Sequence, residues 1–132
     1  MKIVAIDYGA ARTGVAVSDP SGTIARPLGV IERASSESGF ARLVELIRAE
    51  DAERVVVGLP LTLRGERGAQ AQETEAFVEA LRAAGEGPVE SFDERFTTGL
   101  AARVGSDDAP EDARAAAHLL SSYLEWSSAA RE

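Results

Sequence analysis

The sequence contains no cysteine and only one histidine, at position 118. Without thiols, neither a disulfide framework nor a thiolate metal site can form. A single imidazole excludes a multi-histidine zinc site, and a serine triad would depend on that one histidine. Any bound metal ion must therefore be held mainly by carboxylates, which suit Mg²⁺ or Mn²⁺.

Long apolar runs and an excess of positive charge are lacking as well. The apolar stretch within the opening MKIVAIDYG is too short for a signal peptide or a membrane span, which predicts a cytoplasmic protein with no membrane partner. The 14 basic residues against 22 acidic ones give a formal net charge of −8. Because binding depends on local charge, this total excludes no nucleic-acid partner, but it predicts weak binding without a metal ion.

The length and the apolar content are those of one globular domain. The chain has 132 residues, of which 45% are hydrophobic, so residues 1–132 are predicted to form a single domain. Short β-branched segments predict strands, and apolar residues at helical spacing predict helices. The predicted strands cover 2–7, 13–17, 24–31, 54–59 and 88–92, and the predicted helices cover 36–50, 69–84, 97–104 and 110–126.

This order predicts an α/β fold with a mixed five-stranded sheet. Few residues join the first two strands, which should pair as an antiparallel hairpin. Helical crossovers make the first, fourth and fifth strands parallel. Pro27 interrupts the third strand and indicates a position near an edge of the sheet. The first three strands thus form a meander, an α-β-α-β segment follows, and helices cover both faces.

Three acidic residues are expected to meet at the carboxyl edge of the parallel strands, where open α/β sheets bind ligands. Asp7 ends the first strand, the fifth strand runs into Asp93 and Glu94, and Asp112 begins an otherwise apolar stripe on the last helix. Three such carboxylates can hold one or two hard cations that activate water for phosphodiester hydrolysis. Asp7, Glu94 and Asp112 are therefore the candidate catalytic residues and metal ligands of a nuclease.

Each acid also has a simpler interpretation. Asp7 suits a turn, Asp112 suits the N-terminal end of a helix dipole, and Glu94 could pair with Arg95 on the surface. Their convergence at one edge is what favours a site. His118 lies off the Asp112 stripe and is expected to be an ordinary packed or half-exposed helix residue.

Several arginines fall in predicted loops that the topology places near these acids. They could bind phosphates, or they could simply be solvated on the surface. They are Arg12, Arg64, Arg67 and Arg95.

Five motifs in a fixed order resemble those of one bacterial family. They are IDYGAARTGVAVSD at 6–19, VVGLPL at 56–61, GERGAQAQETEAF at 65–77, DERFTT at 93–98 and EDARAAAHLLSSYLE at 111–125. Together they run through nearly the whole chain and resemble the pre-16S rRNA nucleases, also described as Holliday-junction-resolvase-like proteins. No single motif is decisive, but the ordered set is specific.

The resemblance implies an RNase H-like fold and a cytoplasmic role in processing the 5′ end of precursor 16S rRNA. It implies a nucleic-acid partner, with structured or precursor RNA favoured over branched DNA, and ribosome-assembly factors as candidate protein partners. The family's metal-site acids match Asp7, Glu94 and Asp112, and Arg12 and Arg95 match recurrent positions that become candidate phosphate contacts.

The chain departs from the family pattern at three places. Members often carry an Asn and then an acid or amide where this chain has Thr62 and Arg64, and Thr62 becomes a candidate substrate contact. The segment between Val104 and Asp112 is shorter than the Lys-rich loop of many relatives, which predicts a weaker grip on nucleic acid. His118 stands where an apolar residue is common.

Three other functions fit parts of the sequence. Residues 6–19 also resemble the phosphate hairpin of actin-like and sugar-kinase ATP-binding proteins, which need a second domain that 132 residues cannot supply. A non-catalytic module that binds RNA or a ribosome-assembly partner would not need three converging acids. A junction resolvase would act as a dimer on a two-fold substrate. No clear dimer stripe is visible, so a monomer or weak homodimer is expected, and RNA processing and junction cleavage both stay open.

Overall fold

The computed structural model describes residues 1–62, 64–96 and 109–131. Its strands are β1 (Ile3–Asp7), β2 (Arg12–Ser18), β3 (Ala25–Glu32), β4 (Arg54–Leu59) and β5 (Val89–Asp93). Its helices are α1 (Glu37–Ala49), α2 (Ala69–Ala84) and α3 (Glu111–Arg131), and a 3₁₀ helix, η1 (Glu94–Phe96), follows β5. The strands form one five-stranded sheet in the order β3-β2-β1-β4-β5.

The strand directions agree with those predicted from the connections. β1 and β2 pair as an antiparallel hairpin, whereas β1 with β4 and β4 with β5 pair in parallel. β3, which contains Pro27, lies at an edge, and its ladder with β2 shifts register between Val15 and Ala16. Residues without a backbone donor are tolerated at such an edge.

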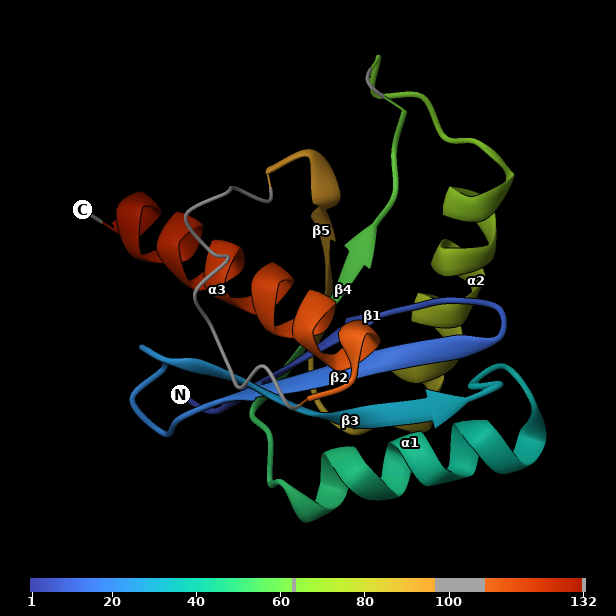
Figure 1. Ribbon diagram of the computed structural model, residues 1–132, viewed down its shortest axis with the longest axis horizontal. Coiled ribbons are helices and arrows are strands. Elements are labelled where there is room, and N and C mark those ends of the chain that lie inside the picture. The colour runs from blue at the N-terminus through green and yellow to red at the C-terminus, as the bar shows by residue number, and fades with distance from the viewer. Residues whose placement is uncertain (63, 97–108, 132) are drawn as a thin grey trace.

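Helices cover both faces of the sheet (Figure 1). α3 crosses one face over β1, β2 and β3, and α1 and α2 pack on the other. Alternation along β1 divides its side chains between the two layers, so Ile3 and Ala5 face α3 while Val4 and Ile6 face α1 and α2. Asp7, two residues beyond Ala5, is thereby placed on the α3 face.

The helix ends follow local chemistry. α1 begins after Ser36, whose hydroxyl accepts a 3.1 Å hydrogen bond from the Gly39 amide. α2 ends at Gly85, which adopts the left-handed conformation at φ 74°. α3 continues to Arg131, past the predicted end at Trp126, because residues 127–131 contain no glycine or proline to stop it.

Other predicted features lie outside the described residues. These are the short helix at 97–104, most of the segment between Val104 and Asp112, and the beginning of the turn at 106–110. The 3₁₀ turn of η1 was not predicted. Within the described part of the chain, no helix is long and apolar enough to cross a membrane.

The first turn of α3 packs directly on β2 because Gly14 has no side chain. A Cβ on Gly14 would lie 1.8 Å from the carbonyl oxygen of Asp112. Gly14 also pairs with Asp7 across the β1–β2 ladder. This glycine therefore seats the beginning of α3 beside the end of β1. The close approach continues along α3 through the fully buried Ala113, Ala116 and Ala117.

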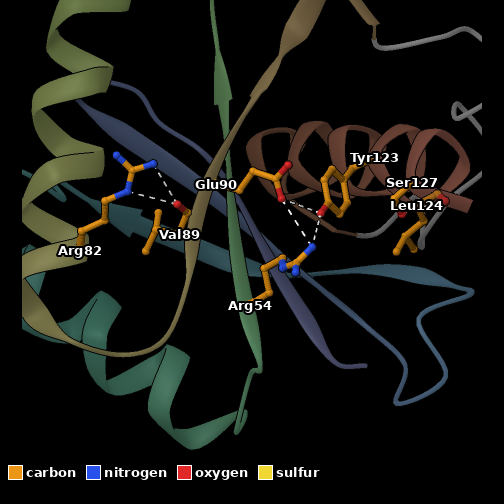
Figure 2. A network of polar contacts seen from close by, with 7 residues as sticks. All are labelled: Arg54, Arg82, Val89, Glu90, Tyr123, Leu124 and Ser127. Atoms are coloured by element: carbon orange, nitrogen blue, oxygen red, sulfur yellow. Dashed lines mark hydrogen bonds and ion pairs between the residues drawn. The ribbon is translucent and has the colours of Figure 1, made fainter. Parts of the chain in front are cut away.

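Farther along α3, Tyr123 ties the helix to β4 and β5 (Figure 2). The residue is buried, and its hydroxyl accepts a 2.9 Å hydrogen bond from Arg54 and donates one of 2.8 Å to Glu90. Burial and the contact with Glu90 raise the pKa of Tyr123, which keeps the hydroxyl a donor. On the opposite side of β5, the Arg82 guanidinium donates to the Val89 carbonyl and holds α2 to the strand.

Candidate active site

Asp7 and Glu94 meet at the edge where β1, β4 and β5 end. Asp7 is the last residue of β1, and Glu94 is the first residue of η1, directly after β5. β4 lies between these strands, and its Gly58 leaves the space that Glu94 crosses. A Cβ on Gly58 would lie 2.7 Å from Glu94 Oε1. The side chain of Glu94 thereby reaches Asp7 and donates a hydrogen bond to it.

The electrostatics of this pair differ from those of ordinary surface acids. Burial, the negative charge of Asp7, the hydrogen bond to Asp7 and the charge of Asp93 raise the pKa of Glu94 from 4.5 to about 7. Burial also raises the pKa of Asp7, which the hydrogen bond from Glu94 lowers in part and the charge of Asp112 raises further. Two half-buried carboxyl groups thus share a proton near neutral pH. Such a pair is a strong candidate for cation binding or acid–base chemistry.

Asp112 lies near this pair without joining it. Its backbone rests on Gly14, the ladder partner of Asp7, and its charge acts on Asp7 from there. Its carboxylate, however, forms an ion pair with Arg12, the first residue of β2, with 3.1 Å between Nε and Oδ2. Across the described ranges, no group of three acidic or histidine side chains is arranged to hold a metal ion. The third predicted acid is therefore at the predicted edge but turned toward an arginine.

His118 is half-exposed, as expected, and it also lines a hollow with the acid pair. A hollow of about 250 Å³ is lined by Asp7, Glu94, Ala115, His118 and Leu119. Asp112, Ala115 and His118 follow at intervals of three and so share a helix face. The stripe that begins at Asp112 includes Leu119, at i+7, but not His118, so the hollow is lined both from that stripe and from the neighbouring i+3 row.

The predicted substrate contacts make hydrogen bonds within the protein. The Arg95 guanidinium pairs with Asp93 at 2.6 Å, so it does not engage Glu94. This partner choice removes the interpretation of Glu94 as half of a surface ion pair with Arg95. The exposed Thr62 accepts a 3.0 Å hydrogen bond on its hydroxyl from the Glu66 amide and shapes the loop after β4.

The donor set of the site suits a hard divalent cation. Asp7 and Glu94 bring two carboxyl groups into contact, and in the described part of the chain no basic side chain forms an ion pair with either. Carboxylate oxygens are the preferred ligands of Mg²⁺ and Mn²⁺. Sequence reasoning missed Gly14 and Gly58, whose lack of a side chain permits this arrangement. Their positions opposite Asp7 and between the two acids emerge only with the strand register.

The sheet order and its helical layers define an RNase H-like fold. The structure of T. thermophilus RuvC in complex with a Holliday junction substrate matches with a TM-score of 0.69 and 19% identity, covering 98% of this chain and 96% of that one. A second structure of Thermus thermophilus RuvC matches with a TM-score of 0.63 and 16% identity, covering 98% of this chain and 97% of the other. At these identities, the likeness establishes the fold.

Sequence comparison assigns the chain more narrowly. The model of the RuvX family, described as Holliday junction resolvase, matches residues 1–126, and the chain belongs to this family. A protein of Chloroflexus aurantiacus named "Putative pre-16S rRNA nuclease" is 41% identical over 93% of this chain and 86% of its own length. One of Syntrophomonas wolfei with the same name is 34% identical over 100% of this chain and 99% of its own length. The family resemblance and the fold predicted from the sequence are confirmed.

Proposed function

We propose that Asp7, Glu94 and Asp112 form the catalytic centre of a metal-dependent nuclease that processes the 5′ end of precursor 16S rRNA. The observation that carries this proposal is the contact between Asp7 and Glu94, with the pKa of Glu94 raised to about 7. Two acids held in contact cost stability near neutral pH, and such perturbed pairs cluster at functional sites. The name shared by relatives that span nearly the whole chain supports precursor rRNA as the substrate.

A divalent cation, Mg²⁺ or Mn²⁺, would be held by Asp7 and Glu94, and Asp112 would join them after leaving Arg12. When bound, it supplies an activated water, stabilises the leaving oxygen and offsets the repulsion between acids and phosphate. Arg12 then becomes available to bind a substrate phosphate. Arg95 can bind another if it leaves its ion pair with Asp93. Thr62, on the loop after β4, is the third proposed substrate contact.

Cleavage of a four-way DNA junction is the second candidate activity. It is favoured by the description of the family and by the RuvC-like fold. We place the proposed rRNA processing in the cytoplasm, with ribosome-assembly factors as candidate partners and a monomer or weak homodimer as the acting form. A dimer would be needed for symmetric cutting of a two-fold substrate.

The test compares Asp7→Asn with wild-type protein on two substrates. One is the 5′ segment of precursor 16S rRNA and the other a four-way DNA junction, each with Mg²⁺, Mn²⁺ or EDTA. We expect metal-dependent cleavage of the RNA and a loss of at least about 100-fold in the variant, because one carboxylate ligand is removed. Glu73→Gln, which neutralises an exposed acid on α2, should cleave like the wild type.

The outcomes separate the candidate functions. Preferred cutting of the junction would replace RNA processing by resolution. Equal cleavage by wild type and Asp7→Asn would show that these acids are not catalytic. If neither protein cuts either substrate under any metal condition, the non-catalytic RNA-binding module becomes the better description.

A further inference from the structure

Two large aromatic side chains are exposed together beside the candidate active site. Phe96, the last residue of η1, is 51% exposed, and Trp126 on α3 is 47% exposed. With Arg95, Ser122 and Glu125 they line a hollow of about 420 Å³. Exposed apolar surface that gathers in one hollow is typical of a binding site. We call Phe96 and Trp126 the aromatic platform.

Two buried aromatic rings, those of Phe92 and Tyr123, pack against the aromatic platform. Phe92, which is buried, lies 5.9 Å from the ring of Phe96 and 5.7 Å from that of Trp126. Tyr123 lies 5.5 Å from Phe92 and 6.0 Å from Trp126. Because the Tyr123 hydroxyl is fixed by its two hydrogen bonds (Figure 2), this backing is rigid. Rigid aromatic surfaces bind flat partners at a low cost in side-chain entropy.

The hollow adjoins the acid pair along both elements that build it. Phe96 lies two residues after Glu94, and Trp126 lies eight residues after His118 on α3. Eight residues of helix span roughly 12 Å. This length corresponds to about three or four stacked nucleotides of one strand. A strand with a phosphate at the acids can therefore place a nearby base against the aromatic platform.

We propose that the aromatic platform stacks an unpaired nucleobase close to the cleaved bond. This inference rests on the proposed nuclease function and narrows its substrate to nucleic acid with a single-stranded segment beside the cut. Paired bases hide their ring faces within the duplex, whereas unpaired bases stack on aromatic side chains. The charges that line the hollow, Glu125 and an Arg95 that is paired with Asp93, leave the two aromatic rings as its main contact surface, so the base is the part that fits there.

Trp126 allows this contact to be observed directly, because it is the only tryptophan in the sequence. The full-length Asp7→Asn variant, in Ca²⁺, would be titrated with a short single-stranded RNA and with a fully paired duplex of the same sequence. We expect the single strand to quench or shift the Trp126 emission and the duplex to leave it nearly unchanged. Anisotropy of a dye-labelled RNA would give the affinity in the same titration.

Substitutions of Phe96 in the same background separate stacking from other effects. Phe96→Ala should weaken binding of the single strand roughly 5- to 100-fold, the range for losing one base–aromatic stack. Phe96→Tyr, which keeps the ring, should bind within about twofold of its parent. Ile24→Ala removes a 64% exposed aliphatic side chain before β3 and serves as the matched control, with unchanged affinity expected.

The results distinguish this inference from the proposed function. An unchanged Trp126 emission, or equal affinity of Phe96→Ala and its parent, overturns the aromatic platform even if the wild type cleaves RNA. A single-strand-specific change that Phe96→Ala removes supports it even if no cleavage is found. Equal responses to single strand and duplex also contradict it, because a duplex offers no free ring face.

Discussion

Among single residues, the choice of partner made by Glu94 has the largest chemical consequence. Its immediate neighbour Arg95 pairs with Asp93, and Glu94 instead reaches over Gly58 to Asp7. Although Glu94 stands next to Arg95 in the sequence, the strand geometry prevents the two from forming an ion pair. A proton, or a metal ion in its place, must neutralise the pair instead.

The raised pKa of Glu94 predicts a pH dependence of stability in metal-free protein. Between pH 4.5 and about 7 the folded state keeps a proton that the unfolded state releases, so this group's stabilising contribution is lost as pH rises through that window. Glu94→Gln has no proton to release at this position, so its stability should not fall over the same pH range. We expect the variant to unfold like the wild type at pH 4 and to be about 1–2 kcal/mol more stable at pH 8, a value reduced for solvent screening of a half-exposed group.

Urea unfolding in EDTA at both pH values measures this effect. Glu73→Gln is the control for the general benefit of removing one negative charge from an acidic protein, and it should show no comparable gain at pH 8. Equal stability of Glu94→Gln and wild type at pH 8 would contradict the shared proton. Adding Mg²⁺ at pH 8 should stabilise the wild type more than Glu94→Gln, because the cation replaces the proton.

The candidate acids could be predicted from the sequence because each stands at a recognisable strand or helix end. Their partners could not, because the sequence does not show which of two adjacent acids turns inward. The pairing of Arg12 with Asp112 joins residues far apart in the sequence and so has no local signal. The place of His118 near the acids has no local signal either, since the hollow that it lines forms only where β1, η1 and α3 meet.

Among the helices and strands, α3 determines whether the site is complete. It carries Asp112 and His118 to the acids, and its first turn can approach β2 only across Gly14. Farther along, the contacts of Tyr123 with Arg54 and Glu90 fix its course over the sheet. The position of α3 therefore depends on one glycine and one buried hydroxyl.

Gly14→Ala should displace the beginning of α3. The added methyl group would overlap the Asp112 carbonyl, which is backbone and cannot rotate away, so we expect a loss of about 3 kcal/mol in the free energy of unfolding. Gly29→Ala, on neighbouring β3, meets nothing within 4 Å and should change stability by less than about 0.5 kcal/mol. Urea unfolding of the two variants side by side measures the difference. Similar stabilities would mean that α3 does not require this close contact.

The order of the elements was predictable because crossovers and hairpins leave few choices for strand direction. Pro27 also indicated the edge strand correctly. The closeness of α3 to β2 was not predictable. A glycine within a strand, such as Gly14, has several possible explanations, and the sequence does not indicate which segment packs on it. The longer α3 shows that a polar tail can remain helical when no breaker interrupts it.

For the molecule as a whole, the net charge of −8 limits how nucleic acid can be held. Three of the four arginines predicted near the site already pair with acids, namely Arg12 with Asp112, Arg67 with Glu75 and Arg95 with Asp93. Substrate binding must therefore depend on the metal ion, on exchange of these few ion pairs and on contacts with bases.

This charge distribution predicts a shallow dependence of RNA binding on salt. With at most four arginine–phosphate contacts, the slope of log K against log[KCl] should not exceed about 3 in magnitude for a single strand. Anisotropy of labelled RNA with the Asp7→Asn variant, in fixed Ca²⁺ between 50 and 200 mM KCl, gives this slope. A slope beyond about 5 would require basic residues other than these four to contact the RNA.

The position of α3 in the chain has a consequence for how the nuclease comes into being. β1 is synthesised well before α3, because the helix that covers it begins roughly a hundred residues later, from Asp7 to Glu111. At ordinary translation rates, a growing chain spends about 5–20 s with its first catalytic candidate made and its covering helix still missing. We therefore expect the site to lack Asp112, and to be inactive, during that interval.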